Sequence, residues 1–151
     1  MPGIVHLLAG AAIGALIPNT FVMMIVAFFS HYLLDFIPHI DPATFAAKER
    51  PYTVIQKIGL SVDVVLVFAF IISLFLVKNT NANIFIGAIT ALLTDILSPL
   101  EEYSVFAPLH KIHRFFHWDE RRAKYWDWYI TGLVSPIAVS AICVFILAKY
   151  T

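Results

Sequence analysis

The chain has 151 residues, of which 60% are hydrophobic and only 13% are charged, and its mean hydropathy is +0.84. A soluble domain carries about a quarter charged residues, so the composition excludes an ordinary soluble domain and predicts a membrane protein. The formal net charge of zero argues against a nucleic-acid partner. The single Cys143 excludes a disulfide framework and a cysteine-based zinc motif. We expect a single transmembrane domain over residues 1–151.

Apolar stretches separated by polar turns predict helices over residues 3–17, 20–37, 52–77, 82–98 and 126–149. The first stretch is short for a membrane span, and its glycines and alanines would let another helix approach closely. Asn19 or Thr20 is the expected N-cap of the second helix, and Pro38 ends it. The predicted fold is all-α: a polytopic membrane bundle of about five helices, the first short, with a long loop at 99–125 before the last.

The distribution of basic residues predicts the orientation of this bundle. With five helices, the N-terminus and the loops 38–51 and 99–125 share one side. That side carries Lys48, Arg50, Lys57, Lys111, Arg114, Arg121, Arg122 and Lys124, whereas the other carries Lys78 and Lys149. Positive charge marks the cytoplasmic side. We therefore expect a multi-pass protein of the inner membrane with a cytoplasmic N-terminus, a cytoplasmic long loop and a C-terminus on the opposite side.

Histidines and aspartates gather near the side predicted to be cytoplasmic. His31 and Asp35 lie one helical turn apart, and Asp95 precedes Pro99 much as Asp35 precedes Pro38. Ionisable groups inside a membrane need a partner, a cavity or a metal, and unrelated histidines have no reason to share one depth. The candidate metal ligands are His6, His31, Asp35, His39, Asp63, Asp95, His113 and His117.

Nitrogen and carboxylate ligands without thiolates suit zinc first, with manganese or iron as alternatives. The candidates outnumber the ligands of one tetrahedral ion, so we expect two divalent ions, which could clamp a phosphoester during hydrolysis. Asp35, Asp95 and Glu101 are candidate catalytic carboxylates, and Arg114 could bind phosphate. Because the site would open at headgroup depth, the expected substrate is a phospholipid or another membrane-associated phosphoester. The sequence does not indicate an oligomeric state.

Short motifs resemble the bacterial membrane-bound metal-dependent hydrolases. His6-Leu7-Leu8-Ala9-Gly10 resembles the start of that family, and the segment 30–38 resembles its Ser-His…Asp signature. The segment 113–117 is similar to its His-Arg-Gly-x-x-His-Ser element but is one residue shorter and lacks the glycine and serine. His-x-x-x-Asp also occurs in zinc-dependent phospholipase C. The resemblance implies metal-dependent hydrolysis, with His31 and Asp35 as ligands.

Other interpretations remain open from the sequence. A transporter of metal ions or protons needs polar residues toward the opposite side, and the helices offer little there beyond Ser73, Thr90, Ser135 and Ser140, which counts against it. A non-catalytic membrane scaffold would need no site. His6 could serve as a helix–helix hydrogen bond, Asp63 could pair with Lys57, and the segment 121–124 could anchor lipid headgroups.

Overall fold

The computed structural model describes residues 1–39, 54–77, 80–97, 115–116 and 128–150. These residues contain no strand, and they form the helices α1 (Gly3–Leu16), α2 (Thr20–Phe36), α3 (Val54–Leu76), α4 (Ala82–Leu97) and α7 (Trp128–Tyr150). Every predicted helix is present, and its described ends lie within two residues of the prediction. The all-α prediction is therefore confirmed for the described part of the chain.

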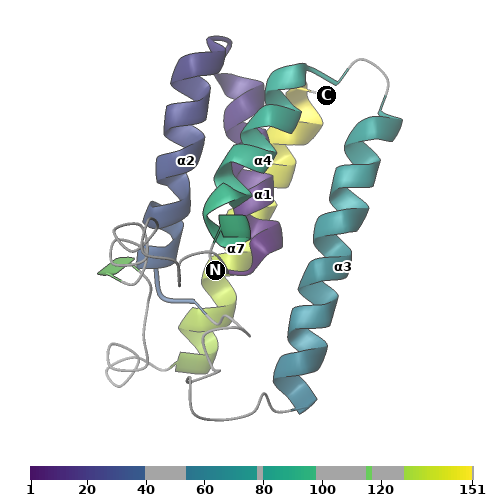
Figure 1. Cartoon of the computed structure of the whole chain (residues 1–151). Helices are drawn as coiled ribbons and strands as arrows, with labels where there is room; N and C mark the ends of the chain where they lie inside the picture. Colours follow the sequence, from purple (N-terminus) through teal and green to yellow (C-terminus); the bar gives the residue numbers. More distant parts are fainter. Residues whose placement is uncertain (40–53, 78–79, 98–114, 117–127, 151) are drawn as a thin grey trace.

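Successive helices run in alternating directions, and α1 lies inside the bundle against α2, α4 and α7, while α3 lies at the outer edge (Figure 1). Lys57–Leu76 of α3 and Gly132–Tyr150 of α7 are long and apolar enough to cross a membrane. The other three helices are apolar but shorter. The alternation brings the start of α1, the end of α2 and the end of α4 to one end of the bundle.

The close contact between α1 and α4 depends on glycine. A Cβ atom added to Gly10 would lie 2.2 Å from the carbonyl oxygen of Gly87, and one added to Gly87 would lie 2.3 Å from the carbonyl oxygen of Gly10. A Cβ on Gly14 would likewise lie 2.1 Å from the carbonyl oxygen of Asn83. The two backbones touch, as the small residues of the first stretch predicted. This contact sets α1 beside α4 along its whole length.

Hydrogen bonds join the C-terminal end of α1 to the N-terminal end of α4. The Asn83 side-chain nitrogen donates to the carbonyl oxygens of Ile17 and Pro18 at 3.2 and 3.0 Å, and its side-chain oxygen accepts from the Thr20 hydroxyl at 2.9 Å. Asn19 is the N-cap of α2, because its side-chain oxygen accepts from the amide of Val22 at 3.0 Å. The bundle is thus tied by hydrogen bonds at the end far from Asp95.

Candidate metal centre

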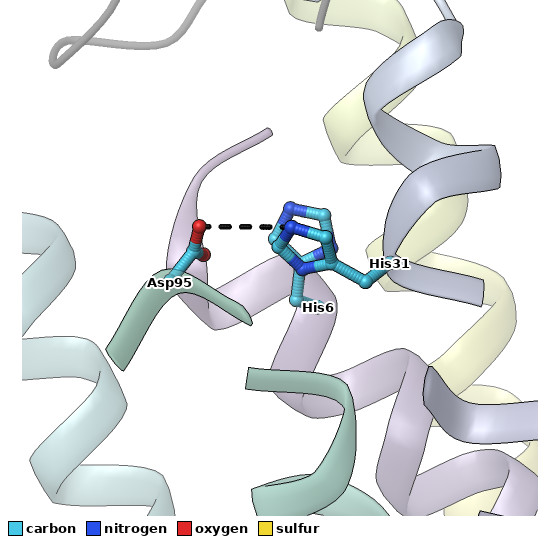
Figure 2. A group of neighbouring side chains, drawn as sticks. All are labelled: His6, His31 and Asp95. Carbon is cyan, nitrogen blue, oxygen red and sulfur yellow. Dashed lines mark ion pairs between the residues drawn. The ribbon is translucent and has the colours of Figure 1, made fainter. Parts of the chain in front are cut away.

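Three helices contribute the candidate ligands at one end of the bundle. His6 comes from the first turns of α1, His31 and Asp35 from the last turns of α2, and Asp95 from the last turn of α4. Figure 2 shows the imidazoles of His6 and His31 stacked on each other beside Asp95, with their ring centroids 4.1 Å apart. Residues that are far apart in the sequence therefore converge, as the alternating helices predicted.

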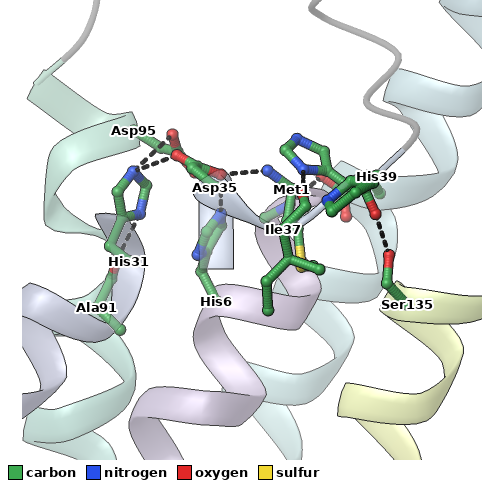
Figure 3. Close-up of polar contacts among 12 residues, drawn as sticks. Met1, His6, His31, Asp35, Ile37, His39, Ala91, Asp95 and Ser135 are labelled. Carbon is green, nitrogen blue, oxygen red and sulfur yellow. Dashed lines mark hydrogen bonds and ion pairs between the residues drawn. The ribbon is translucent and has the colours of Figure 1, made fainter. Parts of the chain in front are cut away.

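The hydrogen bonding of His31 fixes the chemistry of its ring. Its Nδ1 lies 3.0 Å from the carbonyl oxygen of Ala91, and a carbonyl can only accept, so Nδ1 carries the hydrogen. The other nitrogen, Nε2, lies 3.1 Å from an oxygen of Asp35 and 3.7 Å from an oxygen of Asp95 (Figure 3). A bare lone pair facing two carboxylates is repulsive. The contact therefore requires either a proton between this nitrogen and a carboxylate or a bound cation.

His6 and Asp35 form the buried wall of the site. The Nε2 atom of His6 lies 3.1 Å from Asp35, and both side chains are buried. The same carboxylate accepts a hydrogen bond from the Met1 amino group. The Nδ1 atom of His6 is buried and has no hydrogen-bond partner among the described residues. His6 is thus a helix–helix hydrogen-bonding residue and also keeps a nitrogen that a ligand could use.

The spacing of these groups suits one metal ion. Each of His6, His31 and Asp95 offers a ligand atom, and these atoms lie within 4.8 Å of one another. Metal–ligand bonds of about 2.0–2.1 Å place the ligands of a tetrahedral ion about 3.3 Å apart. The distances from His31 Nε2 to the two carboxylates, 3.1 and 3.7 Å, bracket that value. The group could therefore hold a metal ion after small side-chain movements, with Asp35 next to it.

The site is closed on one side and open on the other. His6, His31 and Asp35 are buried, whereas the side chain of Asp95 is 35% exposed. Asp95 also lines a cavity of about 350 Å³ between α1, α3 and α4. Structural metal sites are enclosed by protein ligands, but catalytic sites keep an open position. Asp95 is thus the member of the group that a molecule in this cavity could reach.

Two other predicted ligands lie nearby with other partners. His39 is buried, and its Nδ1 donates to the carbonyl oxygen of Ile37 at 2.7 Å. Asp63 accepts hydrogen bonds from the backbone amides of Gly3 and Ile4, at 2.7 and 3.0 Å. Asp63 therefore caps the start of α1, a role that the sequence did not indicate. Neither residue is one of the three grouped ligands, and metal binding by them stays a prediction.

Several predicted residues lie outside the described part of the chain. They are Glu101, Arg114, His113 and His117, together with the basic segment 121–124, and their roles stay predictions. Of the long loop, Phe115 and Phe116 are described. The ring of Phe116 packs against Tyr32 and Phe36, with centroids 5.7 and 6.5 Å away. This contact places Phe116 beside the end of α2 that carries Asp35.

Three of the four hydroxyls considered as a transport path donate hydrogen bonds to the backbone. Ser73 donates to the carbonyl oxygen of Phe70, and Thr90 donates to that of Ile86, each at 2.7 Å within its own helix. Ser135 donates to the carbonyl oxygen of Pro38. Each of these three hydroxyls therefore forms a hydrogen bond with a backbone carbonyl, two of them inside their own helix.

Sequence reasoning missed one contributor to the site, the carbonyl of Ala91, which orients His31. A backbone carbonyl carries no signal in the residue type. The spacing of Ala91 and Asp95, one helical turn apart, was the only available hint.

Comparison of the chain with protein-family models, with curated proteins and with solved structures gave no match.

Proposed function

We propose that this protein is a membrane-bound metal-dependent hydrolase that cleaves a phosphoester. The observation that carries the proposal is the position of His31 Nε2, which faces Asp35 and Asp95 while a backbone carbonyl holds its other nitrogen. Metal-binding histidines commonly donate their second ring hydrogen to a backbone carbonyl or a carboxylate in this way. A cation at Nε2 would relieve the repulsion between its lone pair and the two carboxylates.

His6, His31 and Asp95 would hold the ion, and Asp35 would either join them or orient His6. A divalent cation bound there supplies Lewis acidity toward a phosphoryl oxygen and activates water for attack. Zinc is the first candidate because the ligands are nitrogen and carboxylate, with manganese and iron as alternatives. A second ion would have His113 or His117 as a ligand.

The membrane setting is part of the proposal. Helices α3 and α7 are long and apolar enough to span a bilayer, and the basic residues predict that the metal-centre end is cytoplasmic. The substrate would then be a phospholipid or another phosphoester held at that surface. In this scheme Asp95 or Glu101 acts as the base, and Arg114 holds the phosphate. The resemblance of residues 30–38 to membrane-bound metal-dependent hydrolases agrees with this assignment.

The test is metal analysis of the purified protein in lipid nanodiscs, combined with phosphodiesterase assays on bis(p-nitrophenyl) phosphate and on phospholipid. We expect about one zinc ion per chain, or about two if the long loop contributes a second site. His31→Phe keeps a ring that can stack on His6 but removes both nitrogens. Changes to outer-shell groups alone lower metal affinity about 10–100-fold, so His31→Phe and Asp95→Asn should lower it at least about 100-fold.

Thr94→Val is the matched control, because Thr94 is buried next to Asp95 and offers no grouped ligand. It should keep both metal and activity. The proposal fails if no divalent metal binds stoichiometrically, or if His31→Phe and Asp95→Asn retain hydrolysis at the level of the Thr94→Val control.

A further inference from the structure

We infer that the cavity between α1, α3 and α4 binds a hydrocarbon chain of the substrate, so that the substrate is a lipid phosphoester entering from the side of the bundle. This inference deepens the proposed function and depends on it for the identity of the head group. It assigns a role to a cavity and to a helix, α3, that the metal centre itself does not use.

The cavity has an apolar body and a polar end. It encloses about 350 Å³, within the range of ligand sites, and its walls include Leu60, Val64, Val67, Phe68, Leu92 and Ile96. Asp95, one of the three candidate metal ligands, also lines it. A ligand that fills this space would lay an apolar chain along α3 and α4 and bring its head to Asp95.

The charges at the polar end select the head group. Asp63 and Asp95 both line the cavity, so an anionic head alone would be repelled. A cation between His31 and Asp95 reverses this preference, because a phosphate can bind the ion directly while its chain stays in the apolar part. The expected ligand is therefore an alkyl phosphate or alkyl phosphodiester whose binding requires metal.

The position of α3 points to a bilayer as the source of the chain. Helix α3 forms one wall of the cavity, lies at the edge of the bundle and is long and apolar enough to span a membrane (Figure 1). Its exposed side chains include Val65, Phe68 and Ile72. In a bilayer these side chains would face lipid, and a chain could pass beside α3 without crossing water.

A second cavity supplies the control. It encloses about 370 Å³ between α1, α3 and α7, and Val62, Leu66 and Ile137 line it. None of the three grouped ligands is among its lining residues. Val62 and Val64 lie two residues apart on α3, with exposures of 51% and 44%, and they line different cavities. Val64→Trp should therefore fill the cavity beside Asp95, and Val62→Trp should fill the second cavity instead.

The experiment uses dodecyl phosphate that carries a diazirine on its chain, added to the zinc-loaded protein in nanodiscs. After irradiation, mass spectrometry locates the labelled residues. We expect labelling on α3 and α4 around Phe68 and Ile96, dependent on zinc. Val64→Trp should lower it about tenfold, the effect of excluding roughly two methylene groups, whereas Val62→Trp should change it less than about twofold. Zinc content, measured on both variants, should stay at the parent value, and Ile96→Trp replaces Val64→Trp if that variant loses zinc.

Three further ligands test the inference: a dodecanol probe, a dodecylamine probe and inorganic phosphate. Equal labelling by the corresponding dodecanol probe, or labelling by a dodecylamine probe without zinc, would overturn the inferred phosphate head. Competition by inorganic phosphate as strong as that by dodecyl phosphate would overturn the chain site, as would equal effects of Val62→Trp and Val64→Trp. Labelling without any hydrolysis refutes the proposed function alone, whereas hydrolysis of a water-soluble phosphodiester without labelling refutes this inference alone.

Discussion

The Nδ1 atom of His31 lies 3.0 Å from the carbonyl oxygen of Ala91, on the same helix that presents Asp95 one turn later. Helix α4 therefore does two things for one imidazole. Its backbone fixes which ring nitrogen carries the hydrogen, and its side chain places a carboxylate 3.7 Å from the other nitrogen. The site depends on the packing of α2 against α4 as much as on the ligands themselves.

The two carboxylates that face His31 should differ in their contributions to stability. Asp35 is 1% exposed and contacts the Met1 amino group, His6 and His31, so Asp35→Asn should lower the free energy of unfolding of the metal-free protein by about 3–5 kcal/mol. Asp95 is 35% exposed, and Asp95→Asn should lower it by about 1 kcal/mol or less. Denaturant unfolding in detergent, followed by circular dichroism, measures both.

Metal binding should also distinguish the Asp35→Asn and Asp95→Asn variants. Asp95→Asn should remove metal from a protein that stays folded, which identifies a ligand rather than a structural residue. An equal loss of stability in both variants would contradict the difference in burial. Thr94→Val should be neutral or stabilising by about 1 kcal/mol, because it removes a buried hydroxyl that has no partner among the described residues.

Asp63 should act as a cap supplied by another helix. It accepts from the amides of Gly3 and Ile4, so Asp63→Ala should lower the free energy of unfolding by about 1–2 kcal/mol and speed hydrogen exchange at those two amides. Ser61→Ala, at an exposed position on the same helix, is the control. Complete loss of metal in Asp63→Asn, with exchange unchanged, would instead identify Asp63 as a ligand.

The backbone contact between Gly10 and Gly87 should tolerate no side chain. An added Cβ would lie 2.2–2.3 Å from a carbonyl oxygen, so Gly10→Ala or Gly87→Ala should destabilise the protein by at least about 1–3 kcal/mol and weaken metal binding. The weakening follows because α1 carries His6 and α4 carries Asp95. Ala69→Val, which adds carbon atoms at an exposed position of α3, should leave the thermal midpoint and the metal affinity unchanged.

Asn83 should stabilise the fold without affecting the metal centre. Asn83→Leu leaves the carbonyls of Ile17 and Pro18 and the hydroxyl of Thr20 without this partner, which should lower the free energy of unfolding by about 2–3 kcal/mol. Thr20→Val removes one of these bonds and should cost about 1 kcal/mol. Metal affinity of the folded variants should equal that of the parent, because Asn83 and Asp95 lie at opposite ends of α4. A large loss of affinity would show that the two ends are coupled.

Much of the fold could be predicted from the sequence because helix-ending and helix-capping residues mark where its helices begin and end. Pro18 and Pro38 end apolar runs, Asn19 caps the next helix, and the alternation of five helices places His6, His31 and Asp95 at one end. The assignment of roles could not be predicted. Asp63 and Asp95 are each the one carboxylate of an apolar helix, and only the packing decides which one meets backbone amides and which one meets an imidazole.

The central position of α1 has a consequence for biosynthesis. This helix contacts α2, α3, α4 and α7, so it must wait for helices made much later before its surface is covered. His31 precedes Ala91, the residue that orients it, by 60 positions. A metal centre at His6, His31 and Asp95 could therefore form on the nascent chain only after α4 has been synthesised. Metal capture would then mark the docking of α4, and chains arrested before α4 would leave the apolar surface of α1 and its buried His6 exposed to quality control.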